Sequence, residues 1–322
     1  MTAEPLDVDL LAFEVGSQAA RAAVVDGVIR SLGTGFVFTS HDIPEGLLDQ
    51  AYEGLAAFFA LPRDDKQRWR AAGTHGQTGY TGLLVETAAA SAVADWKEML
   101  NWSADVPAHH PLRMRYPHRY HEQVLPGDAA VPGLAKALRE LHDCVIDLQT
   151  RLLRVIAVGL GVAESYFDDL VADGPHLTRA IHYPPMRGAP SGEHEWADAH
   201  GDINLITALP RATQRGLQLQ TEDGWVDVVP PERHVIVNSG MMLERLSNGR
   251  IPAGVHRVIA DKDYEGDRIS VVQFCHPAPW FQMGPLASCV DEQHPARYGS
   301  IEAGALLDNV LYEINLIEPD TD

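Results

Sequence analysis

Three side chains that commonly bind metals lie in the second half of the chain at a spacing that could hold one ion. His200 and Asp202 are separated by a single glycine, and residues two apart on a strand point to the same side, so an imidazole and a carboxylate can reach one point. His256 follows 54 residues after Asp202, in another segment of strand character. Two histidines and one carboxylate that leave positions of the metal open are typical of non-haem Fe(II) oxygenases. Taken alone, the His-Gly-Asp triplet is better explained as a solvated or capping pair.

An arginine and a serine lie on one face of the next strand-like segment, RISVVQFCH. These residues are Arg268 and Ser270, and Val272 and Phe274 continue the same face. A guanidinium on an otherwise apolar inward face is costly unless it binds an anion, and its planar fork suits a carboxylate. A 2-oxo acid that chelates the metal could rest its distal carboxylate on Arg268 and Ser270 and leave a third position for O2. The five polar residues together therefore predict an Fe(II) site that uses a 2-oxo acid and O2.

The first half of the chain must supply most of the helices around this site. Apolar residues recur at three- or four-residue steps over 132–161, which predicts the strongest helix, and shorter helices are predicted over 18–31 and after Pro44. Residues 73–82 and 105–130 are predicted to be loops because Gly, Thr and Pro interrupt them. A final helix is predicted over about 300–315.

The second half changes to short β-rich segments after about residue 175. Because no helix of crossover length lies between most of them, the pattern argues against a parallel βαβ sheet and favours a sandwich or jelly roll. The seven segments are LTRAIHY, INLITALP, GLQLQ, WVDVV, HVIVNSG, GVHRVIA and RISVVQFCH.

No Gly/Ser linker separates the two halves, so we expect one integrated unit over 1–322. Within it, 1–170 is expected to be a mainly helical region and 175–280 a jelly-roll core that carries the metal site. The remainder, 281–322, is expected to form a C-terminal helix and tail. The composition predicts neither an oligomeric state nor whether this helix caps the barrel or packs on a partner chain.

Charge narrows the range of partners. The 322 residues include 25 Lys and Arg and 45 Asp and Glu, a formal net charge of −20. This balance argues against nucleic acid or an anionic membrane as a partner and leaves a small molecule. No apolar run is long enough to span a membrane, and the N-terminal residues lack a signal-peptide pattern. Three scattered cysteines, Cys144, Cys275 and Cys289, favour reduced thiols in the cytoplasm.

Longer motifs carry a resemblance to a known family. The segments that carry it are GTGFVFTSHDIPEGLLDQAYEGLAAFFALP, HYPP, AHGDINLITALPRATQRGLQLQTEDGWVDVVPP, VIVNSGMMLERLSNGRIPAGVHRV and RISVVQF. The chain resembles the isopenicillin N synthase-like family of Fe(II)- and 2-oxoglutarate-dependent dioxygenases, and within it the bacterial branch that contains the ethylene-forming enzyme.

The resemblance implies a fold and a set of roles. The fold is an α+β double-stranded β-helix of the jelly-roll, cupin-like type, with N-terminal helices packed outside it. The resemblance implies that His200, Asp202 and His256 are the iron ligands, and that Arg268 and Ser270 bind the C5 carboxylate of 2-oxoglutarate. Tyr183, in HYPP, is a further expected contact of the co-substrate or substrate.

Other residues are weaker candidates for the site. Asn204 continues the face of His200 and Asp202 and is a candidate for co-substrate binding, or simply a satisfied core residue. Arg179 shares a face with Tyr183 and is either a substrate anchor, as in relatives with carboxylate-bearing substrates, or part of a structural ion pair.

Two aromatic residues and one ion pair of the first half are open to similar alternatives. Tyr80, in a predicted loop, is a candidate for substrate binding because loops often carry binding groups, and Trp96 is another candidate, although such a tryptophan is more often a core residue. Lys97 and Glu98 are expected to form a solvated pair.

The function expected from these observations is oxidation of a small molecule, either amino-acid-derived or a specialised metabolite, with hydroxylation as the default outcome and desaturation or cyclisation as variants. One alternative is an oxidase of the isopenicillin N synthase type, which uses Fe(II) and O2 without 2-oxoglutarate. A metal-dependent hydrolase or isomerase and a non-catalytic jelly-roll binding protein are the others. Turnover of 2-oxoglutarate separates the oxygenase from the oxidase, and iron affinity separates both from the binding protein.

Overall fold

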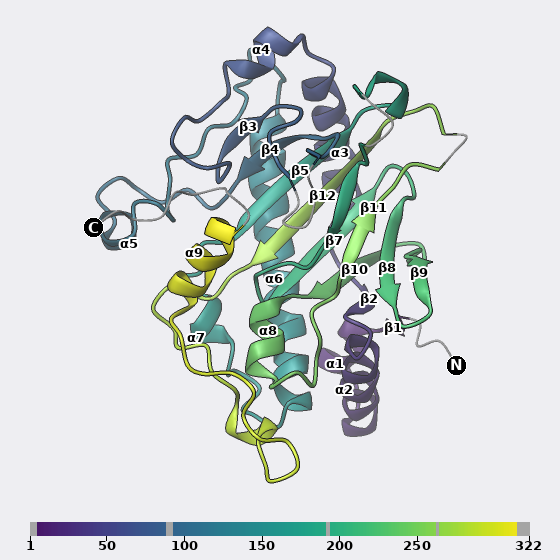
Figure 1. Cartoon of the computed structure of the whole chain (residues 1–322), viewed down its shortest axis with the longest axis vertical. Coiled ribbons are helices and arrows are strands. Elements are labelled where there is room, and N and C mark those ends of the chain that lie inside the picture. The colour runs from purple at the N-terminus through teal and green to yellow at the C-terminus, as the bar shows by residue number, and fades with distance from the viewer. Residues whose placement is uncertain (1–4, 88–92, 191–193, 262–263, 314–322) are drawn as a thin grey trace.

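Two sheets that face each other form the centre of the molecule in a computed structural model, which describes residues 5–87, 93–190, 194–261 and 264–313. Each pair of neighbouring strands is antiparallel except β1 and β2. The larger sheet has the order β1 (Asp7–Val8), β2 (Phe36–Ser40), β10 (His234–Ser239), β7 (Ile206–Ala212), β12 (Arg268–Cys275), β5 (Leu177–Tyr183), β4 (Glu98–Trp102) and β3 (Gly79–Thr81) (Figure 1). The smaller sheet has the order β6 (Ala197–His200), β11 (His256–Val258), β8 (Leu217–Thr221) and β9 (Gly224–Asp227).

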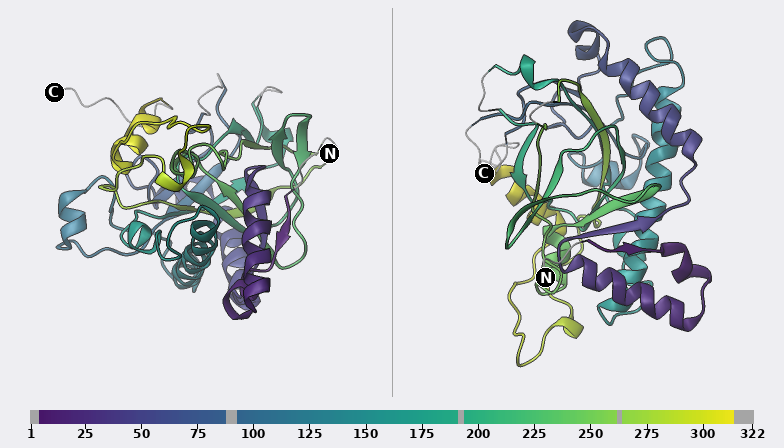
Figure 2. Two further views of the ribbon diagram at one scale, coloured as in Figure 1. Left: turned by 90° about the horizontal axis from the view of Figure 1, so that it is seen from below. Right: turned by 90° about the vertical axis from the view of Figure 1, so that its right-hand side faces the viewer.

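The space between the two sheets is the inside of a barrel, and the right-hand view of Figure 2 shows the sheets on either side of it. Apolar side chains from both sheets fill part of it, among them Phe36, Ile181, Trp196, Leu219 and Val258. The inner faces of β5 and β12 are therefore the surfaces on which a buried site can be built.

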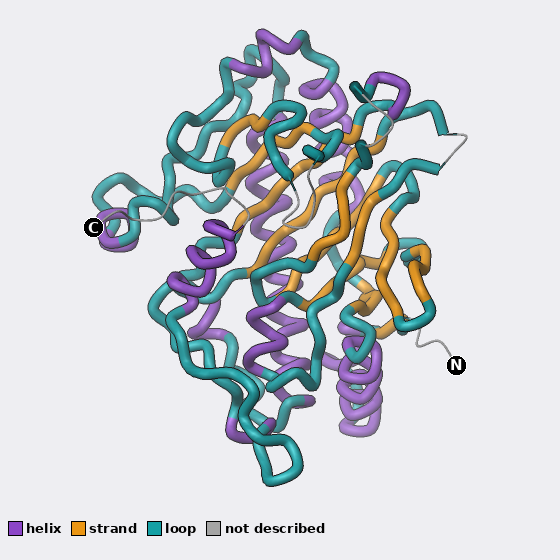
Figure 3. Tube along the Cα trace, viewed as in Figure 1, coloured by secondary structure: helices purple, strands orange, loops and turns teal. Residues whose placement is uncertain are grey.

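Helices cover the outer face of the larger sheet (Figures 2 and 3). The longest is α6 (Leu134–Gly159), whose apolar residues at helical spacing are buried against the sheet. Gln149 of α6 donates hydrogen bonds to the carbonyls of Ile206 in β7 and Gln273 in β12, at 3.1 and 2.9 Å. The other helices are α1 (Leu10–Val15), α2 (Gln18–Leu32), α3 (Glu45–Phe59), α4 (Arg63–Gln67), α5 (Pro111–Arg115), α7 (Asp168–Val171), α8 (Met241–Leu246) and α9 (Ala303–Glu313).

The C-terminal helix packs on its own chain. Ala303, Leu307 and Leu311 of α9 are buried in the same core as α6. Arg119 donates hydrogen bonds to the carbonyl of Gly304 and to the Asp308 carboxylate. The described part of this helix is therefore anchored to the chain's own core.

The predicted fold class is confirmed, and three local predictions are corrected. β3 lies inside the predicted loop 73–82, and α5 lies inside 105–130. Asp202 does not share a strand with His200, because β6 ends at His200. In the described part of the chain, no helix is long and apolar enough to cross a membrane.

Candidate metal centre

Two histidines face each other across neighbouring strands. His200 ends β6 and His256 begins β11, and the two residues are paired in the antiparallel register. Their ring centroids are 4.5 Å apart. Asp202 lies just beyond β6, with its Oδ1 4.0 Å from His200 Nε2. One ligand atom from each of the three residues lies within 4.8 Å of the others, which is compact enough to surround a single ion.

Backbone carbonyls set the direction of both imidazoles. His200 Nδ1 lies 2.7 Å from the carbonyl oxygen of Asp198, and His256 Nδ1 lies 2.9 Å from that of Gly254. Because a carbonyl only accepts hydrogen bonds, each Nδ1 must carry the proton. The Nε2 lone pairs are then free for a metal, which is how ligating histidines are usually fixed. Burial is the largest cause, and His256 the second, of a lowered pKa of His200, which is about 4. The imidazole of His200 is therefore neutral, as a metal ligand must be.

Two polar side chains hold the carboxylate. Asp202 Oδ2 accepts hydrogen bonds from Thr207 Oγ1 at 2.6 Å and Asn238 Nδ2 at 2.8 Å. Thr207 and Asn238 lie opposite each other on β7 and β10. Burial alone would raise the pKa of Asp202, but His256, His200 and these two hydrogen bonds outweigh it and lower that pKa. Asp202 is therefore ionised, with Oδ2 occupied and Oδ1 turned toward the histidines.

A buried arginine lies in the same cavity. Arg268 is 1% exposed, donates from Nη1 to Ser270 Oγ at 2.9 Å and from Nε to the Gln214 carbonyl at 3.0 Å, and stacks 5.0 Å from the Tyr183 ring centroid. Among the described residues no carboxylate pairs with it, and burial lowers its pKa. An uncompensated buried guanidinium is costly, so this position fits an anionic ligand.

The cavity joins the metal-ligating residues to this arginine. Apolar residues from both sheets form much of its wall, so the polar groups are concentrated at a few points. Its lining includes His200, Asp202, His256, Thr207, Asn238, Arg268, Ser270, Tyr183, Arg179, Lys97, Leu209, Leu217, Ile236, Val258, Val272 and Phe274.

The chain is similar to a solved structure along its whole length. A putative 2OG-Fe(II) oxygenase family protein from Caulobacter crescentus superposes with a TM-score of 0.83 at 31% sequence identity, covering 98% of this chain and 100% of that one. This chain belongs to the 2OG-Fe(II) oxygenase superfamily. The family model of that description matches residues 175–277, and a second model, "non-haem dioxygenase in morphine synthesis N-terminal", matches residues 7–126.

Curated relatives agree with this assignment. The 2-oxoglutarate-dependent dioxygenase citB of Monascus ruber is 27% identical over 289 residues, which are 87% of this chain and 86% of the relative. Isopenicillin N synthase of Lysobacter lactamgenus is 31% identical over 183 residues, 54% of this chain and 53% of the relative. The predicted family, enzyme class and dependence on Fe(II), 2-oxoglutarate and O2 are confirmed: the chain is a 2-oxoglutarate-dependent non-haem iron dioxygenase.

The expectation that Lys97 and Glu98 form a solvated ion pair is wrong. Lys97 and Glu98 are both buried and point to opposite sides of the sheet. Lys97 lines the metal cavity, where its Nζ lies 2.7 Å from Asp95 Oδ2 and 3.2 Å from Glu86 Oε2. Glu98 instead accepts hydrogen bonds from Lys66 and Tyr80, away from the cavity. The sequence suggested a surface pair because the two charged residues are adjacent. Their true partners come from distant segments and could not be recognised from the sequence.

Arg179 takes part in a structural ion pair, and it also lines the cavity. It lines the cavity, and its Nη1 lies 3.1 Å from Glu86 Oε1 in a largely buried ion pair. Its Nε donates to Asn101 Oδ1 at 2.7 Å.

Three further candidates lie outside the cavity lining of the oxygenase. The Asn204 amide donates to the Ile206 carbonyl at 2.6 Å and to Thr207 Oγ1 at 3.1 Å, so it supports the residue that holds Asp202. The Tyr80 hydroxyl is bound to Glu98, and Trp96 Nε1 donates to the Pro185 carbonyl at 3.3 Å. The hydrogen bonds of these side chains go to the protein itself.

Four residues of the site were missed in the sequence. Thr207 and Asn238 are single polar residues inside the apolar strands ITALP and HVIVNS, a signal that could have marked them as buried and bonded. Glu86 and Asp95 carry no local signal, because only the fold brings them to Lys97.

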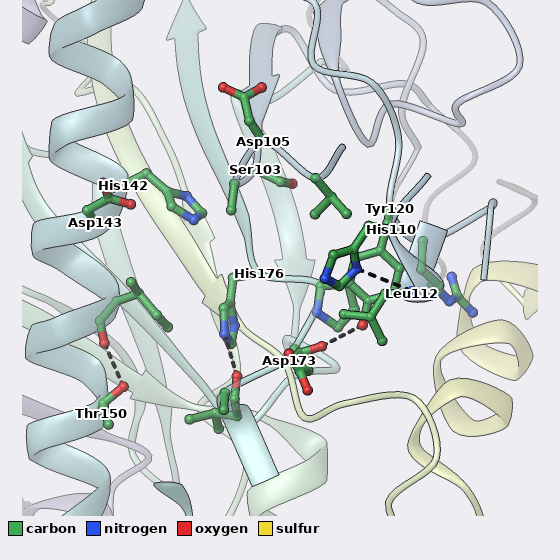
Figure 4. Close-up of a pocket in the computed structure, with 18 of the residues that line it drawn as sticks. Ser103, Asp105, His110, Leu112, Tyr120, His142, Asp143, Thr150, Asp173 and His176 are labelled. Atoms are coloured by element: carbon green, nitrogen blue, oxygen red, sulfur yellow. Dashed lines mark hydrogen bonds between the residues drawn. The ribbon is translucent and has the colours of Figure 1, made fainter. Parts of the chain in front are cut away.

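A second cavity, of about 610 Å³, lies on the opposite side of β5 from the metal, between α6, α7 and residues 103–123 (Figure 4). His142 of α6 and His176 face Tyr120 and His110 across it. His142 Nδ1 lies 2.7 Å from Thr178 Oγ1, and burial lowers the pKa of His142 to about 4. None of the predicted site residues lines this cavity.

Proposed function

We propose that His200, Asp202 and His256 hold the iron of this oxygenase, and that Arg268 and Ser270 hold the distal carboxylate of 2-oxoglutarate. The observation that carries the proposal is the buried, uncompensated guanidinium of Arg268 in the cavity of the three ligands. Bound Fe(II) supplies the activation of O2, with conversion of 2-oxoglutarate to succinate and CO2 coupled to oxidation of a substrate C–H bond.

The chain's own residues bind and orient the reacting groups and exclude water from the cavity. Thr207 and Asn238 keep Asp202 ionised and in place, and Tyr183 covers the face of the Arg268 guanidinium. Val272 and Phe274 continue the inner face of β12 beyond Ser270 and give the substrate an apolar surface. Hydroxylation is the outcome proposed, because it requires only that a C–H bond be placed near the metal.

The proposed substrate is a small organic molecule, amino-acid-derived or a specialised metabolite. The similarity to isopenicillin N synthase supports this class. We also propose that the enzyme works in the cytoplasm, which the free thiols of Cys144, Cys275 and Cys289 support.

The test is an anaerobic titration of the apo-protein with Fe(II) and then 2-oxoglutarate, followed by the weak visible charge-transfer band of a chelated oxo acid. We expect the band in the wild type and its loss in His256→Ala. In Arg268→Gln we expect the concentration of 2-oxoglutarate needed to produce half of the band to rise about 30-fold or more, because a buried charged partner of its carboxylate is lost. Arg187→Gln, which removes an exposed arginine, is the control.

Each other result points to a different conclusion. Iron binding without a band would exclude the role given to Arg268 and favour an oxidase that takes its electrons from the substrate. Failure to bind iron would favour a binding protein.

A further inference from the structure

Two cationic side chains form one wall of the metal cavity, which we call the donor wall. Lys97 directly precedes β4, and Arg179 lies on the neighbouring β5, where it pairs with Asn101 of β4. Both side chains line the cavity that contains the metal ligands. The donor wall therefore faces the space that remains for a substrate.

Hydrogen-bond donors are left over on this wall. The Lys97 ammonium has three N–H groups, of which Asp95 and Glu86 accept two. Arg179 uses Nε on Asn101 and Nη1 on Glu86, and no described residue accepts from its Nη2. The wall can thus donate from Lys97 Nζ and from Arg179 Nη2 to a ligand that has acceptor atoms.

The wall has no net charge in spite of its two cations. Burial alone would raise the pKa of Glu86, but Arg179 and Lys97 outweigh it and lower that pKa to about 2. Burial alone would lower the pKa of Lys97, but Glu86 and Asp95 raise it. Both cations are therefore matched by carboxylates at neutral pH.

The rest of the cavity offers no surplus positive charge either. With iron and 2-oxoglutarate bound, the single charges of Asp202 and Arg268 and the double charges of the iron and of 2-oxoglutarate add up to zero. A substrate carboxylate placed here would lose its water without gaining a free counter-charge, which is unfavourable for a buried ion. An uncharged carbonyl oxygen loses far less hydration and still accepts the spare N–H groups.

We propose that the donor wall binds an uncharged oxygen acceptor of the substrate, a carbonyl or carboxamide, and discriminates against a carboxylate at the same position. Arg179 then acts as a neutralised donor in place of the carboxylate anchor considered from the sequence. Glu86 is the residue that sets this preference, because its carboxylate pairs with both cations and, together with Asp95, leaves the wall without net charge. The inference rests on the proposed function, since it assumes that iron and 2-oxoglutarate occupy the cavity.

The test uses matched pairs of small probes, each a carboxylic acid and its primary amide, such as phenylacetate and phenylacetamide. Each probe is titrated into the anaerobic complex with Fe(II) and 2-oxoglutarate, and broadening of its NMR signals by the paramagnetic iron reports binding near the metal. We expect the amides to bind more tightly than the matched acids in the wild type.

Glu86→Gln removes the neutralising charge and keeps the shape of the side chain. We expect the affinity ratio of acid to amide to rise about tenfold or more in this variant, because Lys97 and Arg179 then carry surplus charge. Asp173→Asn is the matched control, since it removes one exposed carboxylate away from the metal cavity. Asp95 is less suitable, because it also accepts the backbone N–H of Asp198, whose carbonyl orients His200.

Arg179→Gln is a second variant in case Glu86→Gln does not fold. It leaves a net negative wall, so it should weaken the acids further and retain amide binding within a few-fold.

Three results would overturn the inference: acids that bind the wild type as tightly as amides, no amide bound at millimolar concentration, or an acid-to-amide ratio that neither variant changes. If the 2-oxoglutarate band itself does not form, the proposed function fails before any probe is added, so the two failures are distinguishable.

Discussion

At the residue scale, the metal centre depends on side chains that do not touch the metal position. Thr207 and Asn238 occupy one oxygen of Asp202, and the Asn204 amide in turn donates to Thr207. Partners of this kind orient a ligand and typically change metal affinity when they are removed. The carboxylate is therefore held ready for a metal by three strand and loop residues.

Replacing Thr207 by valine tests this support. Thr207→Val keeps the shape and removes one hydrogen bond to Asp202, so we expect the affinity for Fe(II) to fall about tenfold. Competition with a coloured chelator under anaerobic conditions measures the change. Thr150→Val is the control, because the Thr150 hydroxyl bonds only within α6, to the Ile146 carbonyl. Equal affinities in the wild type and Thr207→Val would contradict the role assigned to Thr207.

At the element scale, α6 is attached to the sheet that carries Arg268 by polar as well as apolar contacts. Gln149 reaches from this helix to carbonyls of both β7 and β12 and is itself fully buried. A buried polar side chain with two backbone partners links the outer helix layer to the barrel strands.

Removing this link is expected to destabilise the fold. Gln149→Leu leaves the buried Gln273 carbonyl without its side-chain donor from α6 and the Ile206 carbonyl with Asn204 as its remaining one, so we expect the free energy of unfolding to fall by about 1–3 kcal/mol. Urea denaturation followed by circular dichroism measures it. Lys136→Leu, on the exposed side of α6, should change it by less than about 0.5 kcal/mol. A loss no larger than that of the control would show that apolar packing alone holds α6.

Elements with one apolar face could be predicted from the sequence, and elements with buried charges could not. The spacing over 132–161 predicted α6 to within two residues at each end, and RISVVQFCH predicted β12. β4 was not predicted, because Glu98 and Asn101 are polar residues whose burial depends on Lys66, Tyr80 and Arg179 from other segments. In the same way, spacing indicated His200, Asp202 and His256, but no local pattern indicates the donor wall.

At the scale of the whole molecule, we propose that the chain unfolds as one unit. The main core contains residues of α2, α3 and α6 together with residues of β7, β10 and β12, so the helical region and the barrel bury each other. Metal-free protein in urea should show coincident transitions by far-ultraviolet circular dichroism and tryptophan fluorescence. Two separated transitions would contradict a single unit.

Buried neutral histidines make this stability dependent on pH. Burial lowers the pKa of His142 to about 4 and those of His176 and His276 to about 3, from an ordinary value of 6.5. Below pH 6.5 the unfolded chain takes up protons that the folded chain does not, so stability is complete above this pH and is lost as the pH falls toward 4.

The expected loss is steep enough to measure. Each such histidine contributes about 1.4 kcal/mol per pH unit over this range. We expect His276→Gln to reduce the slope of unfolding free energy against pH by about that amount. Urea denaturation of the metal-free protein at several pH values measures the slope, and the exposed Met114→Gln, which removes no titratable group, should leave it unchanged. An unaltered slope in His276→Gln would mean that His276 is protonated in the folded state.

The donor wall and the metal ligands come from different parts of the chain. Lys97, Asp95 and Glu86 belong to the stretch around β3 and β4, which joins the larger sheet at one edge through β5, whereas the three metal-ligating residues lie on or beside the smaller sheet. A substitution of Glu86, which pairs with both cations of the donor wall, can therefore alter which molecule is admitted without displacing the strands that carry the ligands. In evolutionary terms, descendants of such a protein can acquire new substrates while the oxidising machinery is inherited unchanged.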